Sequence, residues 1–169
     1  ARVASAYIQF TCDEIGSKNI NPFNVTVCGE ATDSAAAYAA TVSNITSRAR
    51  TAASVDWSGA PDWQIEHEAG PAQRTPDIAA VVQEIINRPG WTEGNALALM
   101  IQGQGSRCAE AFEGEPTMTP RLVIVTPVTK EASFGPAASN DDAEERTDTF
   151  AMDLTSSDLE VIQDGSKVQ

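Results

Sequence analysis

The chain has 169 residues, of which 41% are hydrophobic, so it is long and apolar enough for one domain with a buried core. Its net charge is −13, from 24 acidic and 11 basic residues, and such a field repels nucleic acids and anionic lipids, which we do not expect as partners. No apolar run approaches the roughly 18 residues of a membrane-spanning helix, so we expect no membrane insertion. The acidity suits an extracellular or saline setting, or a protein that binds divalent cations.

The first third of the chain predicts strands. In residues 3–11 every second side chain is apolar, which is the pattern of a strand with one buried face. Further strands are predicted at 25–27, 52–57 and 63–66. The Ala-rich stretch 31–41 has no clear pattern.

A helix is predicted over residues 76–88. Thr75 can cap it, Pro76 suits its first position, and Asp77 meets the positive end of the helix dipole. The apolar side chains that recur at helical spacing are Ile78, Val81, Val82, Ile85 and Ile86. The Pro and Gly in residues 87–90 end the helix. We interpret it as a core element without chemistry of its own.

The residues after the helix predict more strands. Residues 96–101 are apolar and predict a buried strand, and residues 103–106, Gly-Gln-Gly-Ser, have the composition of a hairpin turn. A returning strand is then expected at 107–112, and another strand at 121–126.

The last part of the chain begins with a segment, 127–140, that has the Pro, Gly, Ala and Ser content of a linker. An acidic cluster at 141–145 comes next. Strands are predicted at 149–154 and 159–162, and Asp164-Gly165 predicts a hairpin turn into the last four residues. The chain therefore opens within a strand and stops within a hairpin. Its start without methionine or a signal-peptide pattern indicates a mature or trimmed product.

Several stretches match a known module, and they are AYIQFTCDE (6–14), VTVCGEA (25–31), ITSRARTAASVDW (45–57), QRTPDIAAVVQEIINRPGW (73–91), GNALALMIQGQGSR (94–107), EAFEG (110–114), DDAEE (141–145) and LTSSDLEVIQDGSKVQ (154–169). Residues 1–126 resemble the later part, and residues 141–169 the opening part, of a jelly-roll β-sandwich module of large secreted bacterial surface proteins, related to carbohydrate-binding modules. The resemblance implies an all-β, jelly-roll-like sandwich with one α-helix. Its body is 1–126, its linker 127–140, and its completing segment 141–169.

The order of the two parts is reversed relative to that module. There, the part like 141–169 comes first and is joined to the body by roughly fifteen residues, enough for a strand and its turns. Here it follows the body, and the connecting strand is absent. Either the chain is one frame of a tandem array, or its C-terminal segment is exchanged with a neighbouring subunit as a donated strand. Both explanations leave an isolated copy with an unpaired edge, which favours end-to-end assembly.

We therefore predict a non-catalytic structural module, secreted or at the cell surface, whose partner is itself and which assembles into a filament or stalk. The candidate assembly residues are Leu154, Leu159, Val161, Ile162 and Val168. The alternative is a carbohydrate-binding or adhesion module with a polysaccharide partner. A third hypothesis is an accessory domain of a hydrolase. For the carbohydrate alternative, a sugar-stacking platform could be formed by Trp57, Trp63, Trp91 and Tyr38, although we favour core positions for them.

The candidate metal ligands are Asp141, Asp142, Glu144 and Glu145. Calcium takes about six to eight oxygen ligands, often from a carboxylate-rich loop. The related carbohydrate-binding modules often hold a structural Ca²⁺ near such a segment, so the resemblance implies one here. EF-hand spacing is missing, and a solvated run of charges is the alternative interpretation.

The three cysteines, Cys12, Cys28 and Cys108, allow one disulfide and one free thiol, with three possible pairings. Two N-x-T sequons, at Asn24 and Asn44, fit an extracellular location.

Catalytic motifs are weak. His67 is the only histidine, and no serine elbow surrounds it. Paired carboxylates occur at Asp13/Glu14, Glu66/Glu68, Glu113/Glu115 and within Asp141–Glu145, but chance pairs are expected in so acidic a chain. We expect no enzymatic activity.

Overall fold

The computed structural model describes residues 1–127, 131–136, 144–146, 152–153, 158–160 and 167–168. Its strands are β1 (Ser5–Gln9), β2 (Ile20–Glu30), β3 (Arg50–Ser58), β4 (Leu99–Ser106), β5 (Cys108–Glu110), β6 (Arg121–Val125), β7 (Glu131–Phe134), β8 (Glu144–Arg146), β9 (Met152–Asp153), β10 (Asp158–Glu160) and β11 (Lys167–Val168). Among these residues the one α-helix is α1 (Ala79–Ile86), and two 3-10 turns are η1 (Gly16–Lys18) and η2 (Pro71–Gln73). The described chain is therefore mostly β, as predicted.

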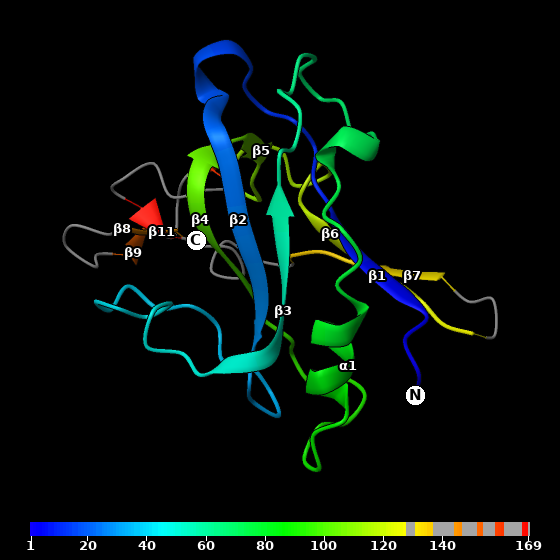
Figure 1. The fold of residues 1–169 in the computed structure, drawn as a ribbon. Coiled ribbons are helices and arrows are strands. Elements are labelled where there is room, and N and C mark those ends of the chain that lie inside the picture. The colour runs from blue at the N-terminus through cyan, green and yellow to red at the C-terminus, as the bar shows by residue number, and fades with distance from the viewer. Residues whose placement is uncertain (128–130, 137–143, 147–151, 154–157, 161–166, 169) are drawn as a thin grey trace.

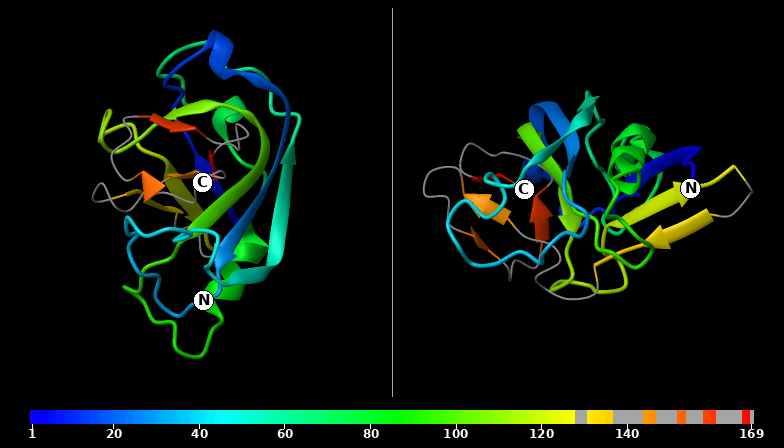
Figure 2. Two further views of the ribbon diagram at one scale, coloured as in Figure 1. Left: turned by 90° about the vertical axis from the view of Figure 1, so that its left-hand side faces the viewer. Right: turned by 90° about the horizontal axis from the view of Figure 1, so that it is seen from below.

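Two three-stranded antiparallel sheets form the body, with strand orders β3-β2-β4 and β1-β6-β7 (Figures 1 and 2). Their facing side chains and those of α1 make one core, which includes Ile8, Phe10, Val25, Val27, Trp57, Val81 and Ile101. The arrangement is consistent with an all-β sandwich. Two smaller antiparallel sheets, β10-β5 and β11-β8-β9, contain the described C-terminal residues.

Most predicted body strands are present, and one is not. The alternation at 3–11 is confirmed in β1, where Ala6 and Ile8 are buried and Tyr7 and Gln9 are half-buried. The strand predicted at 63–66 is wrong, because this stretch is a loop held by hydrogen bonds. Asn19 Nδ2 donates to the Trp63 carbonyl at 2.9 Å, and Trp63 N donates to Asn19 Oδ1 at 2.8 Å.

The helix is shorter than predicted, since it begins at Ala79 rather than at residue 76. Thr75 does not cap the helix, because its hydroxyl accepts a hydrogen bond from Ile8 N at 3.0 Å. Asp77 lies at the start of the helix as predicted, since its Oδ1 accepts a hydrogen bond from Ala79 N at 2.9 Å, and the same oxygen accepts one from Ala6 N at 2.9 Å. The residues before α1 therefore run along β1, and Asp77 joins that strand to the helix start. No helix of the described ranges is long and apolar enough to cross a membrane.

The predicted hairpin turn at residues 103–106 is also wrong, because β4 continues through it to Ser106. The two glycines are required by close packing of β4 on β2. A Cβ on Gly103 would lie 2.2 Å from the Asn24 carbonyl oxygen, and one on Gly105 would lie 2.4 Å from the Pro22 carbonyl oxygen. The returning strand at 107–112 is present only as β5, and it pairs with β10 rather than with β4.

The prediction of a linker at 127–140 is corrected by the structure. Strand β7 lies inside this segment and pairs with β6, from Leu122↔Phe134 to Val125↔Glu131. Among the described C-terminal residues, β10 pairs with β5 and β11 pairs with β8. The hairpin predicted at residues 164–165 lies outside the described residues and stays a prediction.

A second, smaller core lies beneath the loop that connects β2 and β3. Cys28, Ile45 and Met100 are buried there, and Tyr38 and Met152 pack against them. Arg48 holds the loop in place, since its guanidinium lies 2.7 Å from Glu30 Oε2 and 4.2 Å from the centre of the Tyr38 ring.

Candidate functional site

One edge of each main sheet is closed by residues 73–86 (Figure 1). Glu84 on α1 accepts hydrogen bonds from Ala52 N at 2.9 Å and Ala53 N at 2.7 Å, on the outer edge of β3. On β1, Ala6 N and Ile8 N donate to the side chains of Asp77 and Thr75. Four backbone N–H groups that face away from their own sheets are thus paired with side chains. We call this the closed side.

The opposite edges of the same sheets are β4 and β7. Within the part of the chain that the structure describes, β4 forms a ladder only with β2, and β7 only with β6. Phe134 on β7 lies opposite Leu122, so it shares the face of the sheet that carries the core, yet it is 57% exposed. We call these two edges the open side. Exposed strand edges are templates for pairing with another strand.

Strand addition is seen at β5. The backbone there is bounded on one side by residues 11–13, with Asp13 N donating to the Cys108 carbonyl and Glu110 N to the Thr11 carbonyl. On its other side β10 is added in the register Asp158↔Glu110, Leu159↔Ala109 and Glu160↔Cys108. Residues far apart in the sequence therefore meet through backbone pairing.

Two of the predicted assembly residues belong to these added strands. Leu159 lies in β10, and Val168 lies in β11 opposite Glu145. The other three, Leu154, Val161 and Ile162, lie outside the described residues, so their part in assembly stays a prediction.

Polar side chains gather beside β5. Ligand-type atoms of Asp13, Glu14 and Cys108 lie within 4.8 Å of one another. His67 Nε2 lies 3.4 Å from Glu110 Oε1. Burial, with Asp13 and neighbouring carboxylates adding to it, raises the pKa of the Cys12 thiol to about 11. The Cys12 thiol therefore keeps its proton at neutral pH. The neighbouring Cys108 thiol donates a hydrogen bond to Asp13 Oδ2.

As a metal centre this cluster fits calcium poorly. It offers two carboxylates and a thiol, whereas calcium requires about six to eight oxygens. The predicted calcium ligands lie elsewhere. Asp141 and Asp142 are outside the described residues, and Glu144 and Glu145 start β8, with Glu144 opposite Asp153 and Glu145 opposite Met152. Their calcium binding stays a prediction.

The tryptophans do not form a sugar-stacking platform. Trp57 and Trp63 are 5% and 1% exposed, and Phe10 stacks on Trp57 with ring centres 5.9 Å apart. Trp91 is half-buried, and its indole nitrogen is buried without a hydrogen-bond partner in the described part of the chain. Tyr38 lies under Arg48 in the second core. The core interpretation of Trp57 and Trp63 is confirmed, and it removes two rings from the carbohydrate alternative.

The disulfide that the three cysteines allow is not formed, since Cys12, Cys28 and Cys108 are all buried and none is joined to another. The strand register explains why Cys12 and Cys108 are not joined. Cys12 lies opposite Ala109, so it points to the other face of β5 from Cys108. Cys28 belongs to the second core, on the far face of the β3-β2-β4 sheet.

Arg107 is fully buried, and sequence reasoning missed it. Its guanidinium donates to the carbonyls of Pro61 (2.9 Å), Ala60 and Ser106, and it lies 3.2 Å from Asp62 Oδ1. Burial lowers its pKa, and Asp62 opposes that shift. Because Ala60, Pro61 and Asp62 lie about 45 residues earlier in the chain, no local pattern could reveal these partners. Arg107 holds the loop after β3 against the end of β4.

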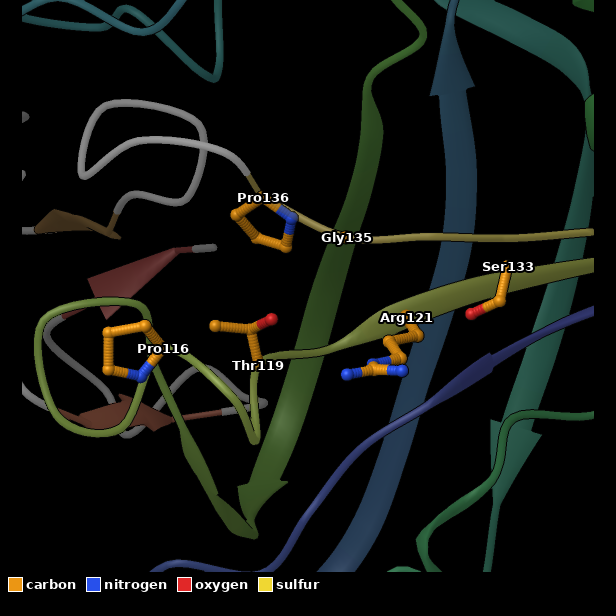
Figure 3. Close-up of a pocket in the computed structure, with 6 residues that line it drawn as sticks. All are labelled: Pro116, Thr119, Arg121, Ser133, Gly135 and Pro136. Atoms are coloured by element: carbon orange, nitrogen blue, oxygen red, sulfur yellow. The ribbon is translucent and has the colours of Figure 1, made fainter.

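A pocket of about 230 Å³ lies between the segment before β6 and the end of β7 (Figure 3). Its lining residues are Pro116, Thr119, Arg121, Ser133, Gly135 and Pro136. Sequence reasoning did not find it, because its two walls are separated by β6 and the turn to β7.

Comparisons of the chain with protein-family models, curated proteins and solved structures find no match, so the conclusions below rest on its own residues and geometry.

Proposed function

We propose that the chain is a non-catalytic, extracellular structural module that assembles end to end with its own copies by strand complementation. The observation that carries the proposal is the addition of β10 to β5. Its register, from Asp158↔Glu110 to Glu160↔Cys108, uses backbone pairing between the C-terminal segment and the body. The same ladder can form when the C-terminal segment comes from a neighbouring copy.

The open side supports the proposal. A jelly-roll sandwich of the kind that the sequence resembles needs one more strand than the body supplies, and among the described residues β4 and β7 each form a ladder with one strand only. Phe134 adds an apolar side chain to that side. The closed side contrasts with this, because its N–H groups already have side-chain partners.

Analytical ultracentrifugation of the full chain over a range of concentrations tests the proposal. Leu159→Pro removes a backbone N–H from β10 without changing the net charge, so it weakens strand addition. We expect large linear assemblies for the wild-type chain and much smaller species for Leu159→Pro.

A matched control is Gln64→Pro, a change in an exposed loop residue away from β10. If the wild-type chain sediments as a single small species at every concentration, the proposal is wrong. If Leu159→Pro assembles as well as the wild type, β10 is not the connecting strand.

A further inference from the structure

We propose that the pocket between residues 116–121 and β7 is a binding site for a small hydroxylated monocarboxylate, the chemical class that includes the uronic acids. The site is separate from the β5-β10 pairing on which assembly depends. Figure 3 shows its layout, with Arg121 and Ser133 toward one end and the rings of Pro116 and Pro136 toward the other.

The cationic end of the pocket is Arg121. Its side chain is exposed, and its hydrogen bond is to the Thr117 carbonyl at 3.2 Å, with no carboxylate partner among the described residues. By contrast, Arg48, Arg88 and Arg107 each lie 2.7 to 3.2 Å from a carboxylate oxygen. A guanidinium left unpaired in a chain of net charge −13 retains donors that match a carboxylate in a fork.

Two hydroxyls line the pocket together with the guanidinium. Thr119 is only 5% exposed, and its hydroxyl oxygen lies at the pocket wall, 3.3 Å from the position that a Cβ on Gly135 would take. Ser133 lies on β7 and is exposed. Both can bond to hydroxyl groups on the body of a ligand.

Space in the pocket depends on Gly135. A Cβ at this position would lie 3.2 Å from the Pro120 carbonyl oxygen and 3.3 Å from Thr119 Oγ1, so any side chain here would enter the pocket. The two proline rings supply apolar walls and no N–H donors. At about 230 Å³ the pocket is smaller than a typical site for a drug-sized molecule, and it suits a ligand the size of one sugar residue.

The charge balance favours a monoanion. The pocket has one cationic side chain and no lysine. A dianionic phosphate or a polyanion would meet the repulsive field of a chain with net charge −13, with a single guanidinium to offset it. A single carboxylate needs no more than this one guanidinium.

Equilibrium dialysis of the full chain against radiolabelled D-glucuronate tests the site, and it works whether or not the chain assembles. We expect saturable binding with a Kd on the order of 1 mM, which is ordinary for a ligand of this size. Arg121→Gln should weaken it at least about tenfold, and Thr119→Val about threefold. Gly135→Ala should also weaken it, because the added methyl group would crowd Thr119 Oγ1 at the pocket wall.

Arg50→Gln is the matched control, because it removes an exposed arginine on β3, and it should bind as the wild type does. Unlabelled acetate should compete, whereas glucose should not. No saturable binding, equal binding by Arg121→Gln and Arg50→Gln, or better competition by glucose or inorganic phosphate than by acetate would each overturn the proposal. Circular dichroism of every variant confirms that the fold is retained.

Discussion

The closed and open sides of the two main sheets satisfy their backbones in different ways. On the closed side, Glu84, Asp77 and Thr75 place oxygens against N–H groups of β3 and β1, so that no strand needs to be added there. On the open side, the described residues provide no such side chains for β4 and β7, and Phe134 is exposed. Since unprotected edges recruit further strands, the difference indicates where a neighbouring chain would attach.

The largest expected loss of stability comes from breaking the contact of β4 with β2. Without this contact β4 has no fixed position, and its other edge cannot pair with an added strand. Gly105 has a φ of +90°, and a Cβ there would lie 2.4 Å from a backbone oxygen. Gly105→Ala should therefore lower the free energy of unfolding by about 3 kcal/mol or more, as measured by urea denaturation.

The control for this prediction is Gly59→Ala. Gly59 has a φ of +67°, but a Cβ there would meet nothing within 4 Å. This variant should lose only the strain of the backbone, about 1 kcal/mol. Equal losses in the two variants would show that the packing of β4 on β2 is not what requires glycine.

A second prediction concerns the place where β10 is added. Burial raises the pKa of Cys12 from an ordinary 9.0 to about 11, so the folded state keeps its proton where the unfolded state loses it. The stabilisation is present below about pH 9 and is lost as the pH rises toward 11, by about 2 to 3 kcal/mol.

Denaturation curves between pH 8 and about 11.5 measure this loss. Cys12→Ala should flatten the decline, although it lowers stability at every pH by removing a buried side chain. A decline that is equally steep in Cys12→Ala would assign the effect to other groups.

A third prediction concerns the hydrogen bonds that Glu84 accepts from β3 on the closed side. Glu84→Gln replaces a carboxylate oxygen that accepts a backbone hydrogen bond with an amide that cannot accept it. We expect a loss of about 1.5 to 3 kcal/mol, the usual range for hydrogen bonds to charged groups. Chemical denaturation measures it, and Glu93→Gln, at an exposed position, should cost almost nothing. Equal stability of the two variants would mean that Glu84 does not seal β3.

The smallest effect on stability is expected on the open side. Phe134→Lys should change the free energy of unfolding by no more than about 0.5 kcal/mol, because the ring is already 57% exposed. It should nevertheless reduce self-association, since a charged edge discourages strand pairing. Sedimentation compares it with Val42→Lys, at a position 66% exposed in the loop before β3. If both variants assemble as the wild type does, Phe134 is not at an interface.

The predictable parts of the fold are those whose signal is local. Alternation in residues 3–11 predicts β1 and its buried face, and the apolar spacing from Ile78 to Ile85 predicts the core face of α1. Both patterns depend only on which side chains a strand or helix turns inward.

The unpredicted parts depend on partners far away in the sequence. Thr75 looks like a helix cap, yet its hydroxyl bonds to Ile8 N on β1, about 70 residues earlier, and Asp77 bonds to Ala6 N on β1 in addition to the first N–H of α1. Gly103 and Gly105 look like a turn, yet they allow β4 to approach β2 closely. The same residue types fit the local role and the contact with a distant strand. Only the pairing of the strands decides which of the two forms.

The pairing of β10 and β11 shows the same limit. In the structure β10 pairs with β5 and β11 pairs with β8, and both partners lie far away in the sequence. A local strand pattern predicts that a strand forms, but it does not specify the strand's partner.

Electron microscopy of the purified full-length chain tests the central claim most directly. If the open side accepts a strand from a neighbouring copy, the images should show regular filaments with a repeat the size of one subunit, and Leu159→Pro should shorten or abolish them. Dispersed single particles for the wild-type chain would show that each copy completes its own sandwich, and would contradict assembly by strand complementation.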